Sequence, residues 1–281
     1  MRKVFLPQNL EALWPLMAEF PGALIYAGGT DLLVKLRLRL VDPPALICLE
    51  RIEELKGVKD QGEEVFIGAA TTHSVLLGDP LIKMHFPVLT QALKVLGSPL
   101  VRNMGTIGGN LITASPAGDT LPPLYVLGAE VELRTKNNRC RLPVQDFIRG
   151  PGNTLLAPGE ILTGVRIRKH PEINIHHFEK VGQRKALAIA LVSLAAALQI
   201  GGDGRVQKAR LAWGSVGPTV VTSREVEAAL EGNPLSLDAL EKAATLARFA
   251  VSPIDDVRAC ADYRRRVAGN LLLRLLLSQN Q

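Results

Sequence analysis

One segment of this 281-residue chain restricts its possible folds more than any other. Residues 97–119 read GSPLVRNMGTIGGNLITASPAGD, in which glycines flank Thr106 and are followed by Asn110. Glycine has no Cβ, so such a backbone can approach a ligand closely, while hydroxyl, amide and carboxylate groups supply directed hydrogen bonds. A turn between two ordinary elements also accepts paired glycines. The density of small and polar residues between apolar runs favours a loop that holds a cofactor.

A second glycine site lies upstream, where residues 23–37 read ALIYAGGTDLLVKLR. The pattern predicts a short apolar strand, a glycine turn over residues 28–31 and a leucine-rich segment. Free backbone N–H groups at such a junction favour an anion. Asp31 would repel a phosphate, so we expect it to accept hydrogen bonds from backbone amides or a sugar hydroxyl. The chain contains neither G-x-G-x-x-G nor the P-loop pattern, which leaves a Rossmann or P-loop fold without support.

Together the two sites resemble the flavin loops of a known family. The chain is similar to the FAD-binding subunits of the molybdenum hydroxylases, the group that contains xanthine dehydrogenase and aerobic carbon monoxide dehydrogenase. AGGTDLL at 27–33 resembles the first flavin loop, and VRNMGTIGGNLITASPAGD at 101–119 resembles the second. The resemblance continues through GAATTH at 68–73, HFEKVGQRKALAIALVSLAAAL at 177–198 and DDVRACADYRRRVAGNLLLRLL at 255–276, and so covers nearly the whole chain.

The resemblance implies an α+β fold of the molybdopterin dehydrogenase type. Two FAD-binding subdomains, expected over residues 1–55 and 56–169, would precede a C-terminal domain over residues 170–281, with a three-stranded antiparallel sheet and helices. The residues themselves predict a β-α-β unit at the N-terminus. They leave the apolar run 186–200 ambiguous, because Ala and Leu favour a helix whereas Ile and Val permit a buried strand.

The resemblance also implies where the flavin binds. Backbone amides of residues 27–31 and 106–110 would line the pyrophosphate, with Gly109 expected at positive φ. Ile112 would border the isoalloxazine ring, and Asp119 would bond the ribityl chain or the ring edge. Lys180 would favour reduced, anionic flavin, with a solvated strand charge as the alternative. The residues expected to bind the cofactor are Ile25, Ala27, Gly28, Gly29, Thr30, Asp31, Leu32, Gly105, Thr106, Ile107, Gly108, Gly109, Asn110, Ile112, Asp119, Leu162 and Lys180.

By the same resemblance the chain is the FAD-carrying electron-transfer subunit of a heteromeric oxidoreductase. A [2Fe-2S] small subunit would deliver electrons from a molybdopterin-containing large subunit, and an external acceptor, NAD or quinone, would receive them. Xanthine dehydrogenase-type members place an aromatic residue on the flavin where this chain has Leu96, which leaves the acceptor open. A stand-alone FAD-dependent oxidoreductase and a non-enzymatic FAD-binding protein are the alternatives. No nucleophile–base motif is present, so we expect no catalytic residue in this chain.

Composition argues against several other classes. The three cysteines form no CxxC, and adjacent His176 and His177 on a strand would point to opposite faces, so we expect no metal. The net charge of +6 comes from scattered residues, and Arg264–Arg266 is expected on a solvated face or a partner contact, so we expect no nucleic-acid binding. No signal-peptide pattern opens the chain, and its longest apolar run is shorter than the roughly 20 residues of a membrane span. We therefore expect a cytoplasmic protein.

Overall fold

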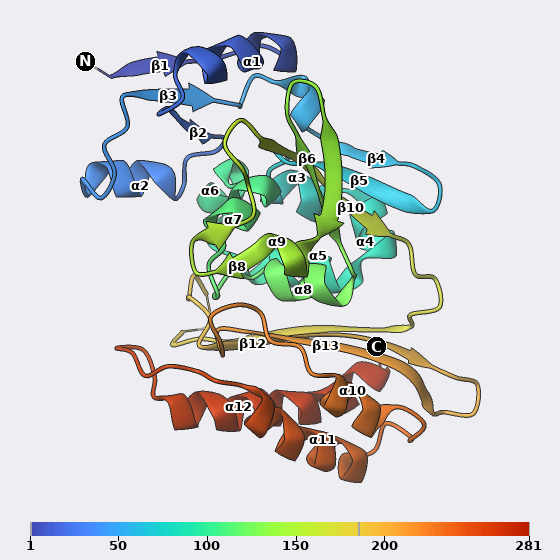
Figure 1. Ribbon diagram of the computed structural model, residues 1–281. Coiled ribbons are helices and arrows are strands. Elements are labelled where there is room, and N and C mark those ends of the chain that lie inside the picture. The colour runs from blue at the N-terminus through green and yellow to red at the C-terminus, as the bar shows by residue number, and fades with distance from the viewer. Residues whose placement is uncertain (1, 185, 281) are drawn as a thin grey trace.

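The computed structural model describes residues 2–184 and 186–280. Three layers of structure follow one another along the molecule in chain order, with the N-terminal sheet at one end and the C-terminal helices at the other (Figure 1). Each layer is built on one sheet of three or five strands, and the helices lie between and outside these sheets. The order of the layers places the two glycine loops of the sequence between the first layer and the second.

The N-terminal layer is a three-stranded parallel sheet in the order β1-β3-β2. Asn9 caps the first helix by accepting a hydrogen bond from the Ala12 N–H, and the helix then continues through Pro15. Leu13 and Ile47 form the centre of a small apolar core under this helix. The elements are β1 (Lys3–Phe5), α1 (Leu10–Glu19), β2 (Leu24–Tyr26), α2 (Leu32–Arg37), β3 (Ala45–Cys48) and the 3-10 turn η1 (Glu53–Leu55).

The central layer is a five-stranded antiparallel sheet in the order β4-β5-β10-β6-β7, covered by seven short helices within the described residues. Its charged network is buried: Arg166 pairs with Glu132 at 2.8 Å and lies over the Phe66 ring. The elements are β4 (Val58–Asp60), β5 (Glu64–Gly68), α3 (His73–Gly78), α4 (Pro80–His85), α5 (Pro87–Val95), α6 (Pro99–Met104), α7 (Ile107–Thr113), α8 (Leu121–Val126), β6 (Glu130–Arg134), β7 (Arg139–Pro143), α9 (Val144–Phe147), β8 (Ile148–Gly150), β9 (Asn153–Thr154) and β10 (Ile161–Arg168).

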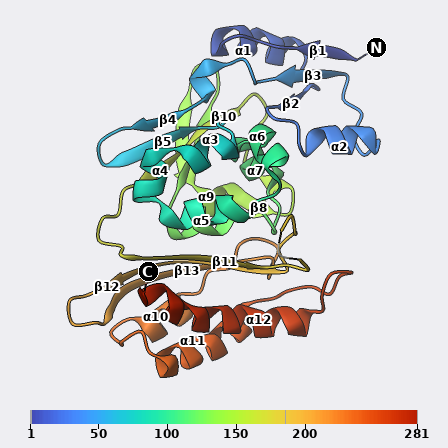
Figure 2. The same cartoon turned by 180° about the vertical axis from the view of Figure 1, so that it is seen from behind.

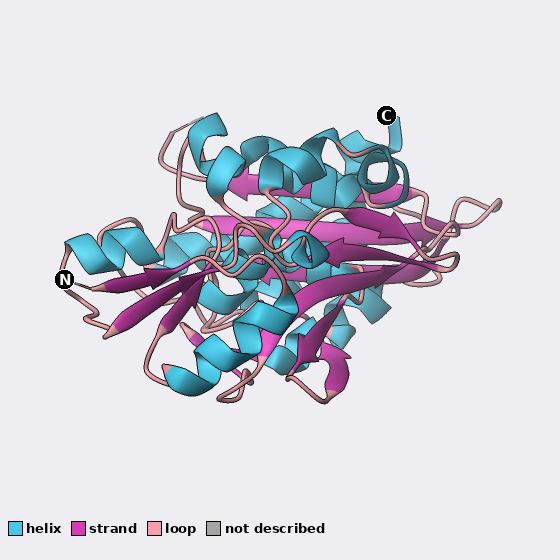
Figure 3. Ribbon diagram, turned by 90° about the horizontal axis from the view of Figure 1, so that it is seen from above, coloured by secondary structure: helices cyan, strands magenta, loops and turns pink. Residues whose placement is uncertain are grey.

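The C-terminal layer is a three-stranded antiparallel sheet in the order β11-β12-β13, with helices on both sides (Figures 2 and 3). The α+β class and this sheet are confirmed. The ambiguous run is a strand from Val192 onward, and both of its faces are buried. Ala195 and Ala197 pack toward the central layer, whereas Leu194 and Leu198 pack toward the C-terminal helices. The elements are β11 (Ile175–Val181), β12 (Val192–Ile200), β13 (Val206–Gly214), α10 (Arg224–Leu230), α11 (Leu237–Ala250), α12 (Ala261–Leu273) and the 3-10 segment η2 (Arg274–Asn280).

One expectation about surface charge is wrong. Arg264 is buried, and its guanidinium pairs with Asp256 at 2.6 Å and donates to the Ser215 carbonyl at 3.2 Å. It therefore ties the start of α12 to the end of β13, while its neighbour Arg265 stays at the surface with Asp262. In the part of the chain that the structure describes, no helix has both the length and the apolar character needed to cross a membrane.

Candidate functional site

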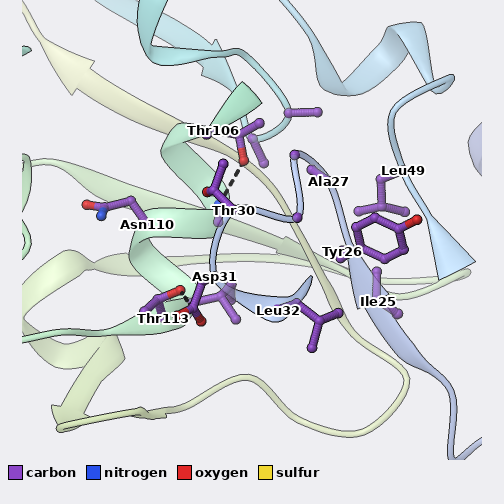
Figure 4. Close-up of a pocket in the computed structure, with 18 of the residues that line it drawn as sticks. Ile25, Tyr26, Ala27, Thr30, Asp31, Leu32, Leu49, Thr106, Asn110 and Thr113 are labelled. Carbon is purple, nitrogen blue, oxygen red and sulfur yellow. Dashed lines mark hydrogen bonds between the residues drawn. The ribbon is translucent and has the colours of Figure 1, made fainter. Parts of the chain in front are cut away.

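A cavity of about 460 Å³ opens between the N-terminal and central layers. The first glycine loop forms one wall of it and the second glycine loop another, so residues far apart in the sequence face each other (Figure 4). Most of the residues expected to bind the cofactor lie in this lining. They are Ile25, Ala27, Gly28, Gly29, Thr30, Asp31, Leu32, Gly105, Thr106, Gly108, Gly109, Asn110, Ile112 and Leu162.

The first loop touches the second at a point where only glycine fits. A Cβ added to Gly28 would lie 1.6 Å from the carbonyl oxygen of Met104, and Gly29 has a φ of +70°. Within the described residues, the N–H groups of this loop, from Gly28 to Asp31, donate to no protein acceptor. Backbone N–H groups away from water are nearly always hydrogen-bonded, so these groups are available to donate to a ligand in the cavity.

The second loop is the start of helix α7. Thr106 caps the helix, and its Oγ1 accepts a hydrogen bond from the Gly109 N–H at 3.1 Å. Gly109 therefore lies in a helical turn and is not among the glycines with positive φ, so that expectation is wrong. Its Cβ would lie 3.0 Å from Thr106 Oγ1, which makes tight packing the physical reason for glycine there.

The GAATTH segment supports the second loop from behind. Its backbone exchanges three hydrogen bonds with the loop, and a Cβ on Gly108 would lie 2.7 Å from the Ala69 carbonyl oxygen. Most of the amides at the start of α7 are therefore used inside the protein, and the loop presents a closely packed wall. The three bonds run from Gly108 N–H to Ala69 O at 2.9 Å, from Ile107 N–H to Thr71 O at 3.1 Å and from His73 N–H to Gly105 O at 2.9 Å.

Asp31 binds two other side chains of the cavity lining. Its carboxylate pairs with Lys35 at 2.7 Å and accepts a hydrogen bond from the Thr113 hydroxyl at 3.3 Å. These contacts connect the beginning of α2 to the end of α7, as Figure 4 shows. The other carboxylate of the lining, Glu160, accepts from the Ala157 N–H at 3.0 Å. Both carboxylates are therefore engaged by the protein itself.

Three expected residues lie outside the lining, and two of these bind each other. Lys180 pairs with Asp119 at 2.6 Å and donates to the Val95 carbonyl at 2.7 Å. The Lys180 side chain is only 7% exposed, so the solvated-charge alternative is wrong. Burial raises the pKa of Asp119 to about 6, although Lys180 opposes this. Val95, which accepts from Lys180, precedes the lining residue Leu96 in the chain, and Ile107 is a fully buried residue of the second loop.

Several lining residues were missed by the sequence analysis. GAATTH contains the signal for three of them, because it belongs to the resemblance, but the segment near residue 160 has no motif to single it out. The missed residues are Leu24, Tyr26, Lys35, Val41, Leu49, Ala69, Ala70, His73, Val101, Thr113, Leu156, Glu160 and Ile161.

His73 is the buried titratable group of this lining, 3% exposed. Burial, helped by the charge of Arg102, lowers its pKa to about 4. In the unfolded chain this histidine has its ordinary pKa of 6.5. Between pH 6.5 and pH 4 the unfolded chain therefore binds more protons than the folded chain, so the stability that the neutral ring contributes is lost as the pH falls through this range.

We expect acid to destabilise the flavin-free chain partly through this group. Between pH 7 and pH 4.5 the His73→Leu variant should lose about 1–3 kcal/mol less unfolding free energy than the unsubstituted chain. Urea unfolding at a series of pH values measures this, and parallel pH profiles for the two chains would contradict it.

The described residues contain no group of three or more His, Cys, Asp or Glu side chains that could hold a metal ion. Cys48, Cys140 and Cys260 are free. The chemistry of the cavity is therefore that of glycine backbone, free amides and apolar walls. This set of groups suits a large, partly apolar ligand with an anionic portion.

Comparison with known families agrees with this geometry. Residues 1–169 match the FAD binding domain in molybdopterin dehydrogenase, and residues 177–279 match the CO dehydrogenase flavoprotein C-terminal domain. The chain is 33% identical to the carbon monoxide dehydrogenase medium chain of Afipia carboxidovorans, over 88% of this chain and 85% of that one. It is 29% identical to the nicotinate dehydrogenase FAD-subunit of Eubacterium barkeri, over 97% and 94% of the two chains.

Solved structures show the same fold. A chain of carbon monoxide dehydrogenase from Hydrogenophaga pseudoflava superposes with a TM-score of 0.93 at 31% identity, covering 99% of this chain and 96% of the other. A chain of quinoline 2-oxidoreductase from Pseudomonas putida 86 gives 0.94 at 29% identity, covering 100% and 98%. The expected cofactor, FAD, and the oxidoreductase class are confirmed by these matches. The chain therefore belongs to the family of FAD-binding subunits of the molybdenum hydroxylases.

Proposed function

We propose that this chain holds FAD in the cavity between its glycine loops and passes electrons from a [2Fe-2S] partner subunit to an external acceptor. The observation that carries the proposal is the first loop, where free N–H groups from Gly28 to Asp31 line the cavity and where Gly28 packs against the Met104 carbonyl so closely that a Cβ would separate the two loops. The relatives named as a medium chain and an FAD-subunit support the same role.

The residues of the cavity fit the parts of FAD. The free amides of residues 28–31 would donate to the diphosphate, which would lie between them and the closely packed wall of the second loop. Ile112 and the apolar walls would border the flavin ring, with Ile25, Leu32 and Leu162 on other parts of the lining. Bound FAD can take up electrons singly and release them as a pair.

Lys180 and Asp119 would act at the flavin from behind Leu96. We propose that the ion pair fixes the position of the strand end and of the Val95 carbonyl, and so of the wall on which the ring rests. Because the Asp119 carboxylate offsets the Lys180 charge, we propose that the pair acts on the flavin through the position of this wall.

The substrate would be oxidised elsewhere, on a molybdopterin-containing large subunit. Within the described residues, the carboxylates of the cavity are both engaged, Asp31 by Lys35 and Glu160 by Ala157. The relatives named as a medium chain and as an FAD-subunit favour a role within a larger enzyme. We therefore prefer the subunit role, with NAD or quinone as the acceptor and the cytoplasm as the expected location.

FAD rather than FMN should co-purify with the chain, without a covalent bond. Two separated loops fit a ligand with two phosphates and a second sugar. The lining contains no cysteine among the described residues, and its histidine, His73, is buried against Gly105. Acid precipitation should release the whole chromophore, and chromatography of the supernatant should identify it as FAD. FMN in the supernatant, or a yellow pellet, would contradict the proposal.

A further inference from the structure

His73 lies where the two glycine loops meet. It is the first residue of α3 and lines the cavity. A Cβ added to Gly105 would lie 3.2 Å from His73 Cδ2 and 3.4 Å from the hydroxyl oxygen of Thr30. The imidazole, the first loop and the second loop therefore share one corner of the cavity.

The imidazole has an unmet hydrogen-bonding capacity. Its Nδ1 atom is buried and has no partner in the described part of the chain. Buried polar atoms are nearly always paired, so an orphaned one calls for an explanation. Rotating the ring by half a turn exchanges Nδ1 with Cδ2, which is the atom nearest to Gly105. The backbone need not move for a ring nitrogen to face that side.

The surroundings of His73 are rich in donors. The first loop reaches this corner through the Thr30 hydroxyl, and its free amides, from Gly29 to Asp31, line the same cavity as His73. Arg102, held by hydrogen bonds to the Leu96 and Gly97 carbonyls, contributes positive charge from α6. The Asp31 carboxylate binds Lys35 and Thr113 through its Oδ2 atom. The unpartnered ring nitrogen, the loop amides and the Arg102 charge together favour anionic oxygens as the ligand atoms here.

We propose that His73 donates a hydrogen bond to the diphosphate of the bound dinucleotide, at the junction of the two loops. The inference rests on the proposed FAD site. A purine or flavin ring edge presents both donors and acceptors, whereas diphosphate oxygens only accept. The donors and the positive charge around His73 therefore favour the phosphates at this position.

The test compares the binding of FAD with the binding of its fragments. Dissociation constants of FAD, ADP, adenosine and riboflavin are measured on the flavin-free full chain, for the unsubstituted protein and for His73→Leu and His73→Gln. The loss of one hydrogen bond to a charged group should weaken FAD and ADP binding about 10- to 100-fold in His73→Leu. Adenosine and riboflavin should be unchanged. His73→Gln should recover part of the affinity, because its amide N–H can donate.

A matched control separates local contact from loss of a buried ring. His176 on β11 also has a buried, unpartnered Nδ1 and does not line the cavity, so His176→Leu should leave all four constants unchanged. If His73→Leu does not fold, His73→Gln alone tests the proposal by its effect on ADP compared with adenosine. Unchanged ADP binding, or an equal loss for all four ligands, would overturn the role of His73. Failure of the unsubstituted chain to bind FAD would instead overturn the FAD site itself.

Discussion

Replacing Gly28 with alanine should weaken FAD binding by about 100-fold or more. The added methyl would lie 1.6 Å from the Met104 carbonyl oxygen, closer than any real contact, and backbone cannot yield as a flexible side chain does. The first loop must therefore move away from the second, and the free amides of the first loop move with it. Titration of the flavin-free chain with FAD, followed by flavin fluorescence, measures the loss.

The control for this substitution is Gly78→Ala. A Cβ at Gly78 meets nothing within 4 Å, so that variant should bind FAD as the unsubstituted chain does. Trp213 reports on the C-terminal domain, because it is buried there and its Nε1–H donates to the Ala268 carbonyl. Its emission should be the same in both variants. FAD binding by Gly28→Ala at the unsubstituted affinity would show that the contact between the loops is not needed.

The positions of the glycine loops were predictable from the sequence, but the way each loop works was not. Gly28 and Gly29 form a tight turn as expected, and the backbone N–H groups of this turn donate to no acceptor within the described residues. Gly109 does not, because Thr106 caps α7 and puts Gly109 in a helical turn. A capping threonine three residues before a glycine is visible in the sequence. The hydrogen bonds between GAATTH and the second loop join residues more than thirty positions apart, so they are not visible in the sequence.

The tertiary contacts of several residues were also not predictable from a sequence pattern. Lys180 and Asp119 are 61 positions apart, and only the packing of β11 on the central layer joins them. Arg264 reads as part of a basic surface run, yet Asp256 neutralises it inside the fold. The strand β12 was ambiguous because alanine is common in helices, whereas here small side chains fit between two helical layers.

The second large effect concerns partners. The FAD-loaded chain by itself should oxidise organic substrates very slowly, because in the proposed function the substrate reacts on the molybdopterin-containing subunit and not in this cavity. Adding the [2Fe-2S] and molybdopterin subunits should restore substrate-dependent reduction of its flavin. The Gly28→Ala chain, added in the same way, should restore none.

The electron-transfer role is tested most directly by following flavin absorbance near 450 nm under anaerobic conditions while substrate is added. The FAD-loaded chain alone should keep its absorbance, and the same chain assembled with both partner subunits should lose it in proportion to the substrate consumed. Rapid bleaching of the lone chain by an organic substrate would contradict the electron-transfer role. It would identify the chain as a stand-alone oxidoreductase.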